Sequence, residues 1–260
     1  MRNYFSTESV AERYAHGRPA FHRHAISRLG SLLASSMPFE RALDVGCGTG
    51  GSTRALEGLT SRIVGIDPSL PMLRRAENRN RIPCVAARGE NLPFNDGRFD
   101  LLTVSSAFHW FDRKLFLAEA ERVLRPAGFL VIYDNYFSGN AIETDELGRW
   151  VYETYRSKYP APPRGSVEFG PGTMKDGFRV LHRDEYEHLV AFTLEELVEY
   201  LQTQTNVIAA VEDGDHSIDD IKAWLRRELR PYFATSPLTV RFGGPIWILR
   251  SERTSAELRG

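Results

Sequence analysis

The chain has 260 residues, of which 42% are hydrophobic, and this composition predicts a packed core and excludes a disordered polypeptide. Its formal net charge of −1 argues against a general electrostatic footprint for nucleic acid. The sequence contains no apolar run of about 18 residues, so it predicts no segment that spans a membrane.

The N-terminus and the cysteines indicate the compartment. Residues 1–6 lack the apolar core of a signal peptide, and we therefore expect a cytoplasmic protein. Cys47 and Cys84 are the only cysteines, and both lie in apolar, strand-like surroundings, which favours buried free thiols over a disulfide. Cysteine and histidine do not cluster at metal-ligand spacing, so no metal site is expected.

Strand and helix patterns alternate through the first half of the chain. Predicted strands cover residues 41–46, 63–67, 82–87, 99–104 and 129–133. Predicted helices cover residues 20–36, a segment after Gly51, and residues 68–80 and 114–124, the last of which is expected to stop at Arg125-Pro126-Ala127-Gly128. This alternation predicts an α/β fold with a doubly wound, mostly parallel sheet and a ligand site at the carboxyl ends of its strands.

The second half has a different pattern. We expect a helix over 140–158, a loop over 160–177, strand-like stretches over 178–192, and helices over 194–210 and 218–232. Residues 238–242 and 246–249 flank Gly243-Gly244-Pro245 and predict a C-terminal antiparallel β-hairpin. The predicted domains are a core of residues 1–136 plus 236–260, and an inserted, mainly helical cap of residues 137–235.

The most informative stretch is Leu43-Asp44-Val45-Gly46-Cys47-Gly48-Thr49-Gly50-Gly51. A buried strand ends there in four glycines, and a helix begins directly after them. A glycine turn between a strand and a helix lets a ligand lie against bare backbone near the positive end of the helix. The stretch therefore predicts a site for a nucleotide-like ligand.

Two cofactors fit this stretch. Gly46, Gly48 and Gly51 satisfy the G-x-G-x-x-G pattern of a dinucleotide site, with Asp67 at the ribose position, so an NAD(P)-dependent oxidoreductase is an alternative. Asp44 lies just before the glycines. A dinucleotide carries phosphates and has no use for a carboxylate at this position, whereas S-adenosylmethionine is cationic and phosphate-free and can use one. A non-enzymatic, regulatory S-adenosylmethionine-binding module is a further alternative.

Three segments together resemble the class I S-adenosylmethionine-dependent methyltransferases of the type 11 group, which implies a Rossmann-like fold. They are Asp44-Val45-Gly46-Cys47-Gly48-Thr49-Gly50, Gly65-Ile66-Asp67-Pro68-Ser69 with Met72-Leu73, and Glu90-Asn91-Leu92-Pro93-Phe94 with Phe99-Asp100-Leu101.

A narrower resemblance is to the trans-aconitate methyltransferase-like branch. Residues 14–21, Tyr-Ala-His-Gly-Arg-Pro-Ala-Phe, are similar to its entry segment, and residues 107–112, Ala-Phe-His-Trp-Phe-Asp, match its His-Trp-Phe signature. Many relatives carry Asp-Ala at the adenine-contacting positions, where this chain has Arg88-Gly89. The adenine contact is therefore expected through backbone at Gly89 and Glu90.

The resemblance implies a set of cofactor-binding residues. Asp67 can accept hydrogen bonds from both ribose hydroxyls, because a carboxylate has two acceptor oxygens. Asp44 is expected to act at the methionine end through backbone and water, or to cap a helix. Tyr14 and Arg18 either close over the methionine carboxylate or belong to a surface helix. The full set is Asp44, Gly46, Cys47, Gly48, Gly50, Asp67, Pro68, Met72, Gly89, Glu90, Ser105, Tyr14 and Arg18.

The sequence indicates fewer residues for the acceptor than for the cofactor. His109 is interpreted as a general base or as a pocket wall beside Trp110, and Trp110 and Tyr136 are the expected substrate contacts. Arg156, Arg164 and Arg179 are the candidates to hold an acceptor carboxylate, and the alternative for each is a charge on the surface.

The predicted function is methyl transfer from S-adenosylmethionine, giving S-adenosylhomocysteine, to a small-molecule acceptor. O-methylation, specifically of a carboxylate, is the favoured form of this reaction. We expect no nucleic-acid or membrane partner, and a monomer or a homodimer.

Overall fold

The structure is a computed structural model that describes residues 3–60, 62–80, 83–163, 174–175, 177–214, 216–234 and 237–254. Its contacts divide the chain into two compact units. The unit that we call the sheet unit comprises Phe21–Asn135, Arg164–Tyr186 and Gly244–Gly260, and the helical unit comprises Met1–Ala20, Tyr136–Pro163 and Glu187–Gly243. In the described part of the chain, the helices fall short of the length and apolarity needed to cross a membrane.

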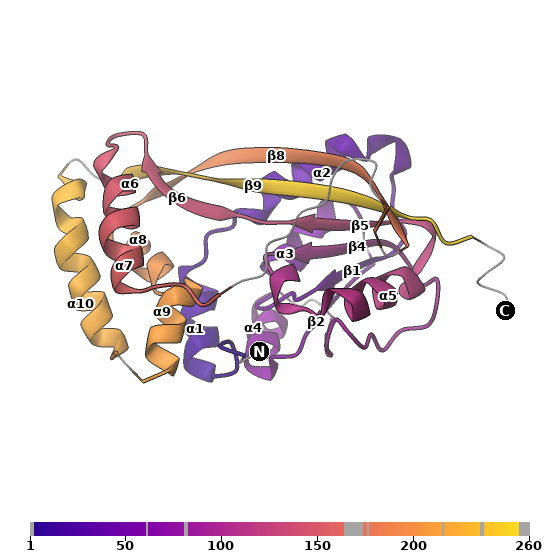
Figure 1. The fold of residues 1–260 in the computed structure, drawn as a ribbon, viewed down its shortest axis with the longest axis horizontal. Helices are drawn as coiled ribbons and strands as arrows, with labels where there is room; N and C mark the ends of the chain where they lie inside the picture. The colour runs from indigo at the N-terminus through magenta and orange to yellow at the C-terminus, as the bar shows by residue number, and fades with distance from the viewer. Residues whose placement is uncertain are drawn as a thin grey trace. The chain divides into compact units, whose positions relative to one another are not determined.

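Five parallel strands form the centre of the sheet unit, in the order β3-β2-β1-β4-β5. Figure 1 labels four of them, β2, β1, β4 and β5. Their bounds are β1 Ala42–Val45, β2 Ile63–Asp67, β3 Cys84–Ala86, β4 Phe99–Ser105 and β5 Leu124–Tyr133. The order continues through β9 (Leu238–Ser251), β8 (Phe178–Phe192) and β7 (Met174–Lys175), and β9 is antiparallel to β5. The predicted mostly parallel sheet with an antiparallel C-terminal strand is confirmed.

Helices cover both faces of this sheet, because alternate side chains of each strand point to opposite faces. Leu43, Leu102 and Leu130 pack on one face with side chains of α5 (Arg113–Val123), and Leu101 and Val131 pack on the other with side chains of α2 (His22–Leu32). The helical elements of the sheet unit are α2 His22–Leu32, η1 Ala34–Ser36, α3 Gly51–Ala55, η2 Leu56–Gly58, α4 Leu70–Asn80, η3 Phe108–Trp110 and α5 Arg113–Val123.

Two predicted boundaries in the sheet unit were wrong. The helix expected over 20–36 ends at Leu32 and is followed by a separate 3-10 turn. The sequence Arg125-Pro126-Ala127-Gly128 follows the end of α5 as expected, but it already lies in β5, which begins at Leu124. Ala127 has φ 59°, so the irregularity that the Pro-Ala-Gly sequence predicts is a distortion inside the strand.

The helical unit contains short helices and strand segments. Its elements are α1 Glu8–Gly17, β6 Tyr136–Ala141, α6 Glu146–Trp150, the π-helical turn η4 Val151–Tyr155, α7 Arg156–Lys158, α8 Leu194–Leu201, α9 Thr205–Glu212, α10 Ile218–Leu229 and η5 Arg230–Phe233. Aromatic side chains form its interior, where Trp150 stacks on Tyr155 and on Trp224 with ring centroids 5.7 Å apart in both pairs.

Two of the predicted helices in this unit were wrong in extent. Residues 136–141 form β6, which pairs with β9, so the helix expected over 140–158 starts only at Glu146. The helix expected over 194–210 is broken into α8 and α9. At the break, the Thr203 hydroxyl and backbone N–H both donate to the Tyr200 carbonyl, which replaces the helical pattern.

The predicted turn at Gly243-Gly244-Pro245 was also wrong, because β9 runs through it as one strand. A Cβ on Gly244 would lie 2.2 Å from the Asp134 carbonyl oxygen, and the Asp134 N–H donates to the Pro245 carbonyl at 3.2 Å. Gly244 therefore lets the backbone of β9 approach the backbone at Asp134 closely. Such an approach, like a turn, requires glycine, so the glycine alone does not indicate a turn.

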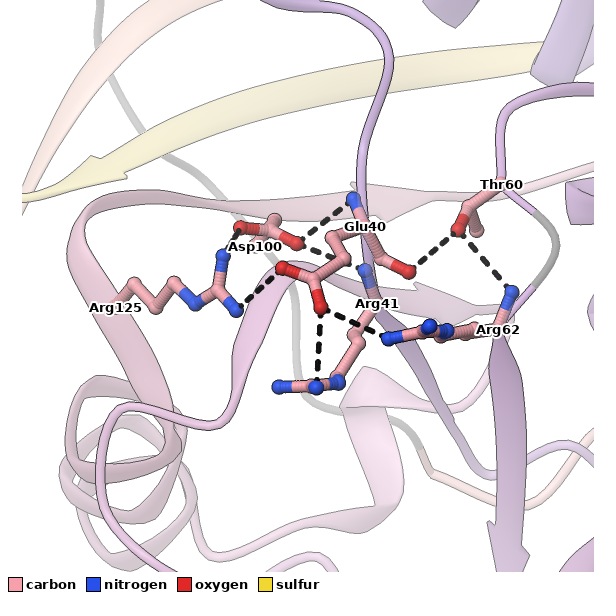
Figure 2. A network of polar contacts seen from close by, with 6 residues as sticks. All are labelled: Glu40, Arg41, Thr60, Arg62, Asp100 and Arg125. Atoms are coloured by element: carbon pink, nitrogen blue, oxygen red, sulfur yellow. Dashed lines mark hydrogen bonds and ion pairs between the residues drawn. The ribbon is translucent and has the colours of Figure 1, made fainter.

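A network of charged side chains lies at the amino ends of the parallel strands (Figure 2). The Asp100 carboxylate accepts from the backbone N–H groups of Glu40 and Arg41 at 2.9 and 2.8 Å, and from Arg125 at 2.7 Å. Glu40 accepts from Arg125 and Arg62, both at 2.9 Å. The network links the entries of β1, β4 and β5 at the end of the sheet away from the glycine turn.

We predict that Asp100→Ala lowers the free energy of unfolding by about 1–3 kcal/mol, because two backbone N–H groups and a guanidinium lose their acceptor. Arg62→Ala should lower the free energy of unfolding by less than about 1 kcal/mol, because the Arg62 side chain, which pairs with Glu40, is 63% exposed and solvent weakens the ion pair. Urea denaturation of both variants measures the difference. Equal losses would contradict this ranking.

Candidate active site

The glycine turn after β1 is fixed by hydrogen bonds to the end of β2 and is open to a ligand at Gly48. Gly46, Gly48 and Gly50 have φ values of 75°, 54° and 79°, a region that favours glycine. The N–H groups of Gly46 and Cys47 both donate to the Ile66 carbonyl, at 2.8 and 2.9 Å. A Cβ on Gly46 would lie 2.6 Å from Ala107, whereas a Cβ on Gly48 would meet no described atom within 4 Å. The turn can therefore take a ligand against the backbone at Gly48.

Asp67 lies at the carboxyl end of β2 and faces this turn. Its two oxygens accept from the N–H of Gly48 at 2.9 Å and from the N–H of Ser69 at 2.8 Å. Burial raises the pKa of this carboxyl to about 6, against the lowering effect of the two N–H groups. Each carboxylate oxygen can accept a second hydrogen bond, so the ionised group can still bind a diol.

Asp44 has a different environment, because its side chain is 0% exposed. The carboxylate accepts from the hydroxyls of Ser52 at 2.6 Å, Thr53 at 2.7 Å and Thr103 at 2.8 Å. Burial raises its pKa, and these three hydrogen bonds oppose the shift. The side chain thus anchors the start of α3 and the strand β4, while a role at the methionine end through backbone and water stays a prediction.

Sequence reasoning missed the hydroxyl groups around Asp44. One signal was available, because Thr103 is a polar residue within the apolar strand Leu101–Val104 and is the register partner of Asp44. Ser52 and Thr53 follow the glycines directly and could have been assigned as the first-turn donors.

A second group that sequence reasoning missed lies at the ends of β4 and β5. His22 Nδ1 lies 3.1 Å from the Tyr133 hydroxyl and 3.3 Å from the hydroxyl of Ser105, a predicted cofactor residue. Tyr133 is buried, and burial raises its pKa well above the ordinary value. A Cβ on Gly51 would lie 3.5 Å from His22 Nε2. The sequence carries no motif for His22, because only the packing of α2 brings it to this edge.

The remaining predicted cofactor residues of the sheet unit lie after β2 and β3. Pro68 is exposed. Met72 is buried in α4, and its backbone N–H donates to the Ser69 hydroxyl. Gly89 is buried, and a Cβ there would lie 3.1 Å from Phe116 and 3.2 Å from Val45. Glu90 accepts from the Asp112 N–H at 3.0 Å.

The predicted acceptor residues are divided between the two units. His109 and Trp110 lie in η3 of the sheet unit, directly after β4, with ring centroids 4.9 Å apart. Tyr136 is the first residue of β6 in the helical unit and is 54% exposed. Tyr14 and Arg18, predicted to bind the cofactor, also belong to the helical unit. The roles of all these residues stay predictions.

Comparison with known proteins agrees with this geometry. Residues 43–132 match the family model described as a methyltransferase domain. A Dictyostelium discoideum protein that carries a methyltransferase name is 24% identical over 94% of each chain. An uncharacterized methyltransferase of Mycobacterium tuberculosis is 28% identical over 78% of this chain and 77% of its own length.

Among solved structures, a protein of Anaeromyxobacter dehalogenans described as a type II methyltransferase has the same fold. Its TM-score is 0.66 at 23% identity, over 90% of this chain and 97% of that one. Residues 43–132 are thus a methyltransferase domain of the class I, S-adenosylmethionine-dependent type, and S-adenosylmethionine is the cofactor. The open backbone at Gly48 and the acceptor oxygens of Asp67 fit that cofactor.

We predict that Asp67→Ala weakens S-adenosylmethionine binding by roughly 1–3 kcal/mol, because the ribose hydroxyls lose a charged acceptor. Calorimetric titration measures it, with the surface variant Asp219→Ala of α10 as the control. Unchanged affinity in a folded Asp67→Ala protein would remove Asp67 from the site.

We also predict that cofactor affinity depends on pH through the same carboxyl. Because its pKa is about 6, the group becomes protonated below pH 6 and loses acceptor capacity. The Kd should be constant above pH 7 and should rise about tenfold by pH 5. Asp67→Asn, which cannot ionise, should bind weakly with a flat profile between those values. The same pH dependence in both proteins would assign the titration to another group.

Proposed function

We propose that this class I methyltransferase transfers the methyl group of S-adenosylmethionine to an oxygen of a small-molecule acceptor, and that this oxygen belongs to a carboxylate. The observation that supports a carboxylate is the environment of Arg18 in the helical unit. The acceptor needs a cation to hold it, and the planar guanidinium of arginine matches a carboxylate with two parallel hydrogen bonds.

Arg18 is half-buried, and its guanidinium contacts neutral groups. It lies over the Tyr14 ring at 4.5 Å and the Tyr200 ring at 5.5 Å, and it donates to the Thr203 carbonyl at 3.1 Å. Its Nε is buried and has no hydrogen-bond partner among the residues that the structure describes. Withdrawing part of a guanidinium from water without a carboxylate partner is costly, so an anionic ligand would stabilise Arg18.

Space for a ligand exists beside this residue. A pocket of about 170 Å³ within the helical unit is lined by residues 16–19, which include Arg18, by residues 190–192 of β8, and by Glu196 and Glu199 of α8. The tyrosine rings hold the guanidinium in one orientation, which reduces the entropy that ligand binding costs.

The three arginines proposed from the sequence support the carboxylate less well. Arg179 is exposed and already pairs with Glu252 at 3.0 Å. Arg156 is exposed, lies over the Tyr152 ring at 4.3 Å and donates to the Phe137 carbonyl. Arg164 lies outside the described residues. Arg18 is therefore the best candidate, and its alternative role at the methionine carboxylate is separated by experiment below.

Methyl transfer to a carboxylate requires the protein mainly to position the two reactants. When bound, S-adenosylmethionine supplies a methyl group that its positive sulfur makes electrophilic. The backbone at Gly48 and the Asp67 carboxylate would hold and orient that ligand, and Arg18 would orient the acceptor. A carboxylate is ionised near neutral pH, so no residue has to remove a proton from it. His109 then serves as a wall of the site beside Trp110.

The setting of the reaction is also a proposal. The nearly balanced net charge of −1 supports a small acceptor over nucleic acid. We propose that residues 137–235 act as the acceptor-binding cap, and that the protein works in the cytoplasm as a monomer or homodimer, without a nucleic-acid or membrane partner.

The test uses a panel of di- and tricarboxylic acids that includes trans-aconitate, with phenols, alcohols and amines for comparison. We expect S-adenosylhomocysteine and a methyl ester with at least one acid. Arg18→Ala should raise the KM for that acid tenfold or more and leave the Kd for S-adenosylmethionine unchanged, whereas Arg156→Ala should change neither. A raised cofactor Kd in Arg18→Ala would instead place Arg18 at the methionine carboxylate.

A second variant tests the absence of a base. His109→Ala should keep a kcat close to that of the unmodified enzyme on a carboxylate acceptor. A loss of about 100-fold or more with intact cofactor affinity would contradict carboxylate methylation and would favour a protonated acceptor with His109 as base.

A further inference from the structure

The two cysteines of the chain, 37 positions apart in sequence, meet at the cofactor site. Cys84 begins β3, and its register partner on β2 is Gly65. Because Gly65 has no side chain, the Cys47 thiol fills its place, with Sγ 2.9 Å from the position of a Gly65 Cβ. Side chains of paired strand residues point to the same face, so the Cys84 thiol lies on the face of the sheet where the Cys47 thiol takes the place of a Gly65 side chain, and the two thiols are neighbours there.

The two thiols differ in exposure. Cys47 is 4% exposed, whereas Cys84 is half-buried on β3, the strand at the end of the sheet order. A small oxidant from solvent therefore reaches Cys84 first, and the Cys47 thiol is already beside it.

We propose that Cys47 and Cys84 form a reversible, peroxide-driven disulfide that closes the cofactor turn of this enzyme. The site is a modification site that is independent of which acceptor the enzyme uses. Cys47 and Cys84 are not joined by a disulfide in the structure, which represents the reduced state.

The reaction has two steps and balances with one peroxide. The Cys84 sulfur attacks hydrogen peroxide, the O–O bond breaks, and Cys84 becomes a sulfenic acid as the first water leaves. The Cys47 sulfur then attacks the Cys84 sulfur, an S–S bond forms, and the S–O bond breaks. The departing hydroxyl takes the Cys47 proton and leaves as the second water.

The neighbouring Cys84 thiol and burial raise the pKa of Cys47 well above its ordinary value. Cys47 is therefore a poor nucleophile toward reagents in solution at neutral pH, and its reaction depends on contact with an oxidised Cys84. The second step should become faster as the pH rises, because the thiolate is the reacting form.

The disulfide would act on the cofactor through the turn. An S–S bond of about 2.05 Å is much shorter than a contact between two thiols, so it draws Cys47 toward β3. Cys47 lies between Gly46 and Gly48, and the Gly48 N–H is the group that donates to Asp67 at 2.9 Å. Displacement of the turn therefore disturbs the backbone and the carboxylate that fit the cofactor.

The experiment treats the full-length protein with hydrogen peroxide and measures both the bond and its effect. Mass spectrometry of the digested, non-reduced protein should show a peptide pair joined through Cys47 and Cys84. Calorimetry should show S-adenosylmethionine affinity reduced tenfold or more, and dithiothreitol should restore it.

Cys84→Ser is the matched control, because it removes one thiol outside the cofactor turn. Its affinity for S-adenosylmethionine should equal that of the reduced protein before and after peroxide. Peroxide-treated protein with two intact thiols, or with Cys84 oxidised and Cys47 still a thiol, would overturn the proposal. A disulfide that forms without any change in affinity would also overturn it.

Discussion

The buried carboxylate of Asp44 is the interaction on which the sheet unit depends most. A charge without solvent needs a full set of donors, and Ser52, Thr53 and Thr103 provide three hydroxyl hydrogen bonds. These donors come from the first turn of α3 and from β4, so the charge sets the distance from β1 to both elements. The glycine turn lies between the strand and the helix, and its shape follows from that distance.

Polar groups are concentrated at the two ends of the parallel strands, and they serve different purposes there. At the amino ends, Asp100, Arg125 and Glu40 satisfy one another and the backbone in an open, solvated network (Figure 2). At the carboxyl ends, Asp67 is half-buried, and its pKa of about 6 reflects the cost of burial. The network at the amino ends stabilises the fold. Asp67 at the carboxyl ends is a carboxylate whose charged form is disfavoured by burial, and such a shifted pKa is typical of a functional site.

The chemistry of methyl transfer explains why the acceptor is harder to identify than the cofactor. An activated methyl group requires orientation more than proton transfer, so a dedicated catalytic base is not required. The acceptor must instead be inferred from charge, and Arg18 is informative because its contacts, Tyr14, Tyr200 and Thr203, are all neutral. These groups come from α1, α8 and the break after α8, which are distant in sequence.

The mostly parallel sheet, the glycine turn and the cofactor class were predictable from the sequence, because they depend on local patterns: apolar runs, glycine and a strand-end acid. The strand order and the extent of β9 came from the tertiary structure, in which Gly244 serves a close backbone approach and not a turn. The tertiary structure also supplied the donors to Asp44, the place of His22, and the position of the Cys47 thiol beside Gly65, the register partner of Cys84. Each of these results from strand register or from packing between segments far apart in the chain, and local sequence patterns carry no record of such distances.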